Sequence, residues 1–169
     1  RDDLADGGMQ HVADTIRAIR NENPGAQVEA LISDAKGTDS LDTVLNERPD
    51  VLNHNIETVA RLQRMVRPSA GYARSLSVLA RSRAAGLTTK SGLMLGLGET
   101  RDEVEATLTD LASVGVNIVT IGQYLRPSAQ HLPVVRYAEP SEFEHYKQFG
   151  EGLGINHVES SPLTRSSYH

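Results

Sequence analysis

The sequence alternates short β-rich runs with longer segments of helical periodicity, and this alternation repeats along the whole chain. A helix is predicted at residues 9–20. Within it, Val12, Ile16 and Ile19 recur at spacings of four and three residues, which places them on one face. Repeated strand–helix units without hairpin signals predict parallel strands joined by right-handed crossovers. We therefore expect an α/β protein whose sheet is either open and doubly wound or forms a complete or partial barrel.

Turn residues and apolar periodicity delimit the remaining predicted elements. Strands are predicted at residues 27–33, 50–55, 92–98, 116–125 and 155–161, and further helices at residues 39–47, 56–66, 72–86, 101–115 and 140–154. Gly86 is expected to end one helix and Pro140 to begin another. Thr100 and Glu103 have the spacing of a capping box. The mostly apolar run at 92–98 predicts a strand buried on both faces.

The composition excludes several classes of partner. The net charge of −5 gives no basic surface for nucleic acid, and only 4% of the residues are aromatic. No apolar run approaches the roughly 20 residues of a membrane span, so no membrane partner is expected. Cysteine is absent, which excludes disulfides and thiolate ligands within these 169 residues. The length suits one domain.

Polar residues collect where each predicted strand ends. They are Ser33, Asp34, Asn53, His54, Asn55, Glu57, Gly98, Glu99, Thr100, Gln123, Tyr124 and Arg126. In barrels, the loops that follow the strands carry the functional sites. Asn and Gln amides both donate and accept hydrogen bonds, whereas Glu carboxylates only accept them. Together such groups could bind a ligand that carries amines and hydroxyls.

Each of these residues also has a structural interpretation. Asn53 and Asn55 could hydrogen-bond to the backbone of their own turn. Glu57 is predicted in the first turn of a helix, where a carboxylate complements the helix dipole without any ligand. Glu99 could simply be a neighbour of the helix cap. The sequence alone leaves these alternatives open.

Three further motifs give weak signals. The glycines of 92–98 do not have the spacing of a dinucleotide-binding loop. Lys90 is interpreted as an exposed lysine, the alternative being a buried amine for imine chemistry in an unrelated barrel enzyme. His54, His131 and His157 match no local metal-ligand motif, so a shared metal site is not expected.

Four strings resemble one enzyme family closely: "VLNHNIETV", "TKSGLMLGLGET", "TIGQYLRPSAQHLPVVRY" and the terminal "RSSYH". They resemble lipoyl synthases, which are radical S-adenosylmethionine (radical SAM) enzymes, and the likeness runs the whole length. The resemblance implies a partial TIM-like (β/α)6 barrel, of which this chain covers about strands three to six. Residues 1–169 would then be the C-terminal part of a single barrel domain, with the C-terminal residues 155–169 carrying the R-S-S-Y motif.

The resemblance also implies a reaction and its cofactors. Lipoyl synthases insert two sulfur atoms at C6 and C8 of a protein-bound octanoyl group. They use S-adenosyl-L-methionine and two [4Fe-4S] clusters, one of which supplies the sulfur. The implied partners are an octanoylated lipoyl carrier, such as an E2 lipoyl domain or the glycine cleavage H protein, and an iron–sulfur cluster donor. The implied location is the cytoplasm in a bacterium or the mitochondrion in a eukaryote.

Site residues follow from the same resemblance. The implied cofactor-binding residues are Asp2, Asp3, Asn53, Asn55, Glu57, Gly96, Gly98, Glu99, Gln123 and Arg126. A serine of the R-S-S-Y motif is expected to bind iron of the second cluster, with Ser167 preferred and Ser166 as the alternative. A serine alkoxide binds iron less well than a thiolate, which suits a cluster that is consumed. Arg165 could balance nearby negative charge, and Tyr168 could pack the tail.

One departure from the family is large. Lipoyl synthases carry six cluster cysteines, and this chain has none. We therefore expect this chain alone to be inactive. Two explanations stay open. Either the chain is the C-terminal portion of an ordinary lipoyl synthase, or it is a cysteine-free relative that binds lipoyl carrier proteins without catalysis.

Overall fold

The computed structural model describes residues 4–35 and 39–167. Its strands are β1 (Glu29–Leu31), β2 (Val51–Asn53), β3 (Thr88–Leu95), β4 (Ile118–Gln123) and β5 (His157–Ser160). Its helices are α1 (Met9–Glu22), α2 (Ser40–Asn46), η1 (Ala60–Leu62), α3 (Gln63–Val66), α4 (Tyr72–Ala84), α5 (Arg101–Ser113) and α6 (Pro140–Gly152). The sequence predicted this alternation of strands and helices.

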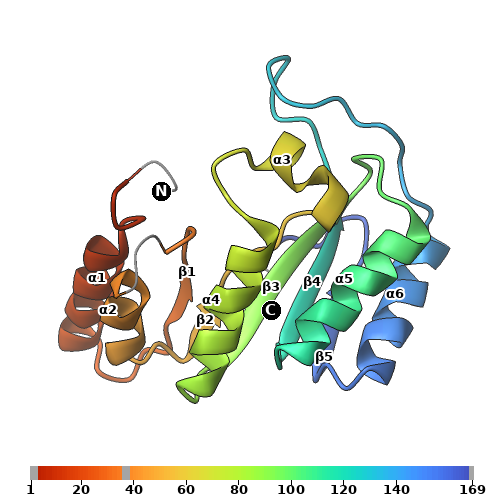
Figure 1. Ribbon diagram of the computed structural model, residues 1–169. Helices are drawn as coiled ribbons and strands as arrows, with labels where there is room; N and C mark the ends of the chain where they lie inside the picture. The colour runs from red at the N-terminus through yellow and green to blue at the C-terminus, as the bar shows by residue number, and fades with distance from the viewer. Residues whose placement is uncertain (1–3, 36–38, 168–169) are drawn as a thin grey trace.

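The five strands form one parallel sheet in the order β1-β2-β3-β4-β5. An order that follows the chain without reversal is that of a barrel segment, whereas a doubly wound sheet reverses at its centre. Right-handed crossovers then place the connecting helices on one face, and Figure 1 shows α4 and α5 in front of β3 and β4. The connecting helices therefore do not cover the opposite face of the sheet.

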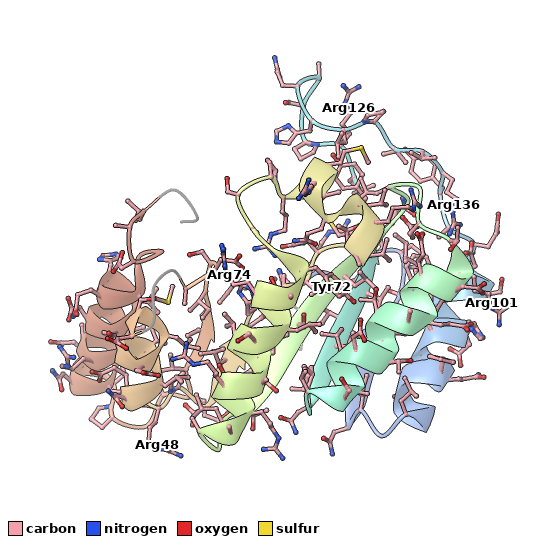
Figure 2. The ribbon with its side chains drawn as sticks, viewed as in Figure 1. Arg48, Tyr72, Arg74, Arg101, Arg126 and Arg136 are labelled. Atoms are coloured by element: carbon pink, nitrogen blue, oxygen red, sulfur yellow. The ribbon has the colours of Figure 1, made fainter. Side chains whose placement is uncertain are left out.

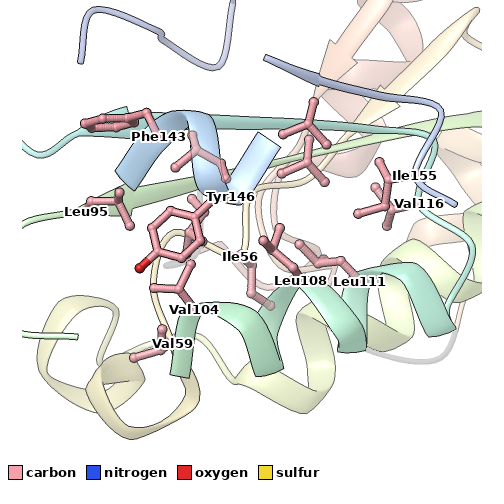
Figure 3. Packing of buried hydrophobic residues seen from close by; sticks show 14 of the residues in the cluster. Ile56, Val59, Leu95, Val104, Leu108, Leu111, Val116, Phe143, Tyr146 and Ile155 are labelled. Atoms are coloured by element: carbon pink, nitrogen blue, oxygen red, sulfur yellow. The ribbon is translucent and has the colours of Figure 1, made fainter. Parts of the chain in front are cut away.

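Alternate residues of the central strands face different surroundings. In β3, Leu93 and Leu95 belong to the larger hydrophobic cluster, which includes residues of α5 and α6. Figure 3 shows Leu108 and Leu111 of α5 in this cluster with the fully buried Tyr146 of α6. The alternate residues of β3, which are Thr88, Lys90, Gly92 and Met94, point to the opposite face, which we call the inner face of the sheet. A second cluster packs α1 and α2 against β1 and β2.

The predicted boundary signals are confirmed. Thr100 accepts a hydrogen bond from the Glu103 amide, and the Glu103 carboxylate accepts one from the Thr100 amide, which completes the capping box. Pro140 is the first residue of α6. Gly86 follows α4 with a φ of 83°, a left-handed conformation that favours glycine.

The predicted helix at 56–66 is wrong in its first half, because helical structure begins only at Ala60. The Glu57 amide donates to the carbonyl oxygen of Gly92, and the Met94 amide donates to that of Glu57. β3 therefore takes the backbone hydrogen bonds that a first helical turn would need. Glu57 has a φ of 66° and bridges to Leu93, so the helix-dipole interpretation of its carboxylate is wrong.

Candidate functional site

A cavity of about 230 Å³ lies on the inner face of the sheet. It is lined by Asn55, Glu57, Gly92, Leu93, Met94, Thr120, Gly122, Gln123, Leu125, Thr164, Arg165 and Ser166. These residues come from the loop after β2, from β3 and β4, and from the segment that follows β5. The cavity therefore brings together three of the predicted site regions.

The segment 161–167, which we call the tail, folds back over the inner face. The Ser161 amide donates to the Ile121 carbonyl at 3.1 Å, and the Gln123 amide donates to the Pro162 carbonyl at 3.4 Å. The Ser166 carbonyl accepts a hydrogen bond from the Asn53 amide group at 3.4 Å. Ser167 lines a neighbouring pocket with Glu29, Leu31, Asn53 and Ser166. The two predicted serines thus lie beside β1 and β2.

The two asparagines after β2 have different surroundings. Asn55 Oδ1 accepts a hydrogen bond from the Gly92 amide at 2.9 Å, so it serves the backbone of β3. Asn53 Nδ2 donates to Glu29 Oε1 at 2.8 Å. Asn53 is 1% exposed, and its Oδ1 has no hydrogen-bond partner among the described residues. A buried acceptor in this state is a place where a ligand could donate a hydrogen bond.

An apolar groove of about 660 Å³ adjoins the cavity. It is lined mainly by Met65, Val66, Met94, Leu97, Tyr124, Leu125, Pro127 and Leu132. Glu57, Met94 and Leu125 line both spaces, which therefore lie side by side. A ligand with one polar and one apolar or aromatic end could span them.

The glycine-rich loop after β3 is held by Glu99. Its carboxylate accepts hydrogen bonds from the amides of Gly96 at 2.7 Å and Leu97 at 2.9 Å, and the residue is 5% exposed. Gly96 and Gly98 have φ values of 103° and 105°. A Cβ at Gly96 would lie 2.5 Å from the Arg136 carbonyl oxygen, so only glycine fits. Glu99 shapes the loop that borders the apolar groove.

Gln123 and Arg126 brace the long segment between β4 and α6. Gln123 Nε2 donates to the carbonyls of Tyr124 and Arg136, both at 3.1 Å, and its Oε1 accepts from the Ala138 amide at 2.9 Å. Arg126 donates to carbonyls within its own loop, at 2.8 Å for His131. Figure 2 shows Arg126 in the loop above the sheet. Gln123 lines the cavity, and Arg126 is not among its lining residues.

The interpretation of Lys90 as exposed is wrong. Its side chain is buried, and Nζ lies 3.0 and 3.2 Å from the two carboxylate oxygens of Glu29. Both residues occupy inner-face positions, on β3 and β1, where they meet across the sheet. Lysines inside proteins are almost always paired with an acidic group, and Glu29 is the partner of Lys90.

A buried polar cluster joins the ends of β1 and β2 to α4. Asp34 Oδ1 lies 3.0 Å from His54 Nε2 and accepts from Ser75 Oγ at 3.2 Å. It also pairs with Arg67 at 3.3 Å, and Asp34 Oδ2 lies 3.6 Å from Arg74, which Figure 2 labels. Asp34 and His54 are both 0% exposed. Both residues were predicted among the polar residues at strand ends, and no local pattern indicates that they pair.

Burial would raise the pKa of Asp34, but the hydrogen bond and charge of His54, together with Arg67, lower that pKa to about 2 from a usual 3.8. The charged carboxylate is thus favoured in the folded state. Its stabilisation should be complete above about pH 4 and should disappear as the pH falls from about 4 to about 2. Urea unfolding across this range should show a steeper loss of stability for wild type than for Asp34→Asn. Parallel curves for the two proteins would contradict this assignment.

Other groups named in the sequence analysis either lie outside the described residues or do not line the cavity. Asp2, Asp3 and Tyr168 lie outside the described residues. The three histidines have different partners: His131, in the loop after β4, hydrogen-bonds to Ser128, and His157, in β5, lies 3.6 Å from Glu159. His54 contacts Asp34 and Ser75. Among residues 4–35 and 39–167, no group of three or more His, Asp or Glu side chains could hold a metal ion. Within the same ranges, no helix is long and apolar enough to cross a membrane.

The sequence missed much of the cavity lining, including Gly92, Met94, Thr120, Gly122 and Thr164. One signal was available. Gly122 stands inside a predicted strand, where glycine often marks a close approach of another backbone.

Comparison with known proteins gives consistent matches. A family profile described as "Radical SAM superfamily" matches residues 3–111. The chain is 56% identical to the lipoyl synthase of Chlorobaculum parvum over 100% of this chain and 59% of that protein. It is also 56% identical to the lipoyl synthase of Rubrobacter xylanophilus, covering 54% of that protein. The chain therefore spans little more than half the length of these curated relatives.

Solved structures with low sequence identity share the fold. A domain of pyruvate-formate lyase-activating enzyme from Bacteroides vulgatus superposes with a TM-score of 0.66 at 10% identity, over 90% of this chain and 93% of that chain. Methylornithine synthase superposes with a TM-score of 0.64 at 11% identity, over 94% and 54% of the two chains. These likenesses concern the fold alone.

Proposed function

The chain belongs to the radical SAM superfamily and has the partial TIM-like barrel fold, and from this premise we propose that it is the C-terminal part of a lipoyl synthase. Such an enzyme inserts two sulfur atoms at C6 and C8 of a protein-bound octanoyl group. The identity of 53–56% to curated lipoyl synthases over essentially the whole chain carries the proposal. The position of Arg165 and Ser166 at the cavity supports it.

The described residues fit S-adenosylmethionine. Its methionyl and ribose groups would face Asn55 and Glu57 in the cavity. The buried Asn53 Oδ1, in the neighbouring pocket, could accept a hydrogen bond from the same ligand. Its purine would lie in the apolar groove beside Gly96 and Gly98, whose loop Glu99 holds in shape. Gln123 and Arg126 would support the far wall of that groove through their loop. When bound, the cofactor supplies the radical that activates C–H bonds.

Two [4Fe-4S] clusters do not fit this chain alone. The sequence contains no cysteine. In the described part of the tail, Ser166 lines the cavity and Ser167 lines the neighbouring pocket. We infer that one of them, Ser167 in preference, adds an oxygen ligand to a cluster whose thiolates lie outside these residues. The chain alone is then inactive.

The proposed partners follow from the reaction. They are an octanoylated carrier, either an E2 lipoyl domain or a glycine cleavage H protein, and a donor of iron–sulfur clusters. The lipoyl synthases named above come from bacteria, in which the reaction would take place in the cytoplasm. In a eukaryote it would take place in the mitochondrion.

The proposal is tested with the full-length protein that contains this chain, reconstituted with iron and sulfide and supplied with S-adenosylmethionine and an octanoylated H protein. Mass spectrometry should detect the lipoyl product. Ser167→Ala should lower product formation by at least about tenfold, as loss of a metal-site interaction does. Ser113→Ala, at an exposed helical serine, is the control.

The outcomes decide which serine binds the cluster and whether the full-length protein is a lipoyl synthase or a non-catalytic relative. If Ser166→Ala causes the loss and Ser167→Ala does not, the ligand assignment moves to Ser166. If the full-length protein carries no cysteines and forms no product yet binds the octanoylated carrier, it is a non-catalytic relative.

A further inference from the structure

We propose that Gly122 is a positioning residue for the tail, because its missing side chain leaves the space that the backbone of Thr164 occupies. The functional meaning of this position rests on the proposed function, since it fixes where Ser166 and Ser167 stand. The structural part of the proposal does not depend on any cofactor.

The contact between Gly122 and the tail is a backbone contact. A Cβ at Gly122 would overlap the Thr164 carbonyl oxygen and lie 3.1 Å from its carbonyl carbon. Arg165 Nη1 would be 3.2 Å away. Backbone atoms cannot swing aside as a flexible side chain can, so any larger residue must displace the tail itself. No positive φ accounts for this glycine, and the close approach does.

The tail is shaped to meet this point. The Thr164 amide donates to the Ser161 carbonyl at 3.1 Å, and the hydroxyls of the same two residues are hydrogen-bonded at 2.8 Å. Thr164 is only 2% exposed. The turn at 161–164 therefore places the Thr164 carbonyl in contact with Gly122 of β4. The residues that follow then cross the inner face of the sheet.

A second anchor holds the far end of the tail. Asn53 donates to the Ser166 carbonyl, and it is itself fixed by Glu29, which also pairs with Lys90. Gly122 and Asn53 thus hold the tail at both ends of the segment 164–166. Reactive sites tolerate displacements of only about 0.5 Å, so lifting the tail from β4 by a methyl group should misplace both serines.

The test uses the full-length protein with Gly122→Ala and, as matched control, Gly152→Ala, because a Cβ at Gly152 meets no atom within 4 Å. Trypsin cleavage after Arg165 reports release of the tail, and cleavage after the exposed Arg83 reports opening of the rest of the fold. We expect Gly122→Ala to speed cleavage after Arg165 by about tenfold or more while cleavage after Arg83 is unchanged. Gly152→Ala should match wild type at both sites.

Unchanged cleavage after Arg165 in folded Gly122→Ala overturns the proposal, as does an equal rise at Arg83. If Gly122→Ala does not melt cooperatively, the same trypsin assay is carried out on Asn53→Ala, which removes the hydrogen bond to Ser166. Unchanged cleavage after Arg165 in that variant also overturns the proposal. In the lipoyl assay, Gly122→Ala should lower kcat, whereas Gly152→Ala should match wild type. Because proteolysis needs no cofactor, a wild-type protein that makes no lipoyl product refutes the proposed function and leaves the tail result standing.

Discussion

Asp34→Ala should lower the free energy of unfolding by about 3–5 kcal/mol, because it removes one partner from a buried set of charges. Asp34 is the shared acceptor of His54, Ser75 and Arg67, and its Oδ2 also accepts from the Gly71 amide at 3.2 Å. Without the carboxylate, these donors stay buried away from water but no longer have a hydrogen-bond acceptor, so their desolvation is not compensated. Urea denaturation at pH 7 measures the effect.

The control for this prediction is Asp42→Ala. Asp42 pairs with Arg81 at 2.8 Å, but their side chains are 53% and 39% exposed. Exposed pairs contribute about 0–1 kcal/mol, so this variant should be nearly as stable as wild type. Equal losses for Asp34→Ala and Asp42→Ala would show that the buried cluster adds nothing beyond a surface ion pair.

Glu99→Ala should have the second large effect, lowering the free energy of unfolding by about 2–4 kcal/mol. It leaves the amides of Gly96 and Leu97 buried without the acceptor that shapes the glycine-rich loop. The same change should weaken S-adenosylmethionine binding to the full-length reconstituted protein, measured by equilibrium dialysis, because the groove loses its wall. Glu144→Ala, on the exposed face of α6, serves as control.

Two results would count against this account of Glu99. A stability equal to wild type would mean that the loop keeps its shape without the carboxylate. A stability loss with unchanged cofactor binding would mean that the purine does not lie beside Gly96 and Gly98.

The sequence predicted the fold where local signals were strong. The capping box at Thr100 and the proline at the start of α6 depend on residues a few positions apart, and both were confirmed. The parallel sheet followed from repetition of strand and helix. Glu57 was misplaced because β3, distant in sequence, takes its backbone hydrogen bonds. Lys90 was misjudged because its partner Glu29 lies on another strand.

The candidate site was predictable only in part, for the same reason. Motifs located Asn55, Glu57 and Ser166, and the structure places all three around one cavity. No motif shows that Thr164 lies against Gly122, since that contact depends on how the tail crosses the sheet. Properties set by contacts between distant segments are invisible to local patterns.

The hydrogen bond between Asn53 and Ser166 joins residues 113 positions apart in the chain. Contacts of such long range form late, because the entropy of closing a long loop must be overcome after the nearer strands have paired. The tail should therefore dock as the last step of folding and detach as the first step of unfolding, before β3 and β4 separate. Its docking is then a separate equilibrium, so a newly made chain would have an assembled sheet before Ser166 reached the cavity.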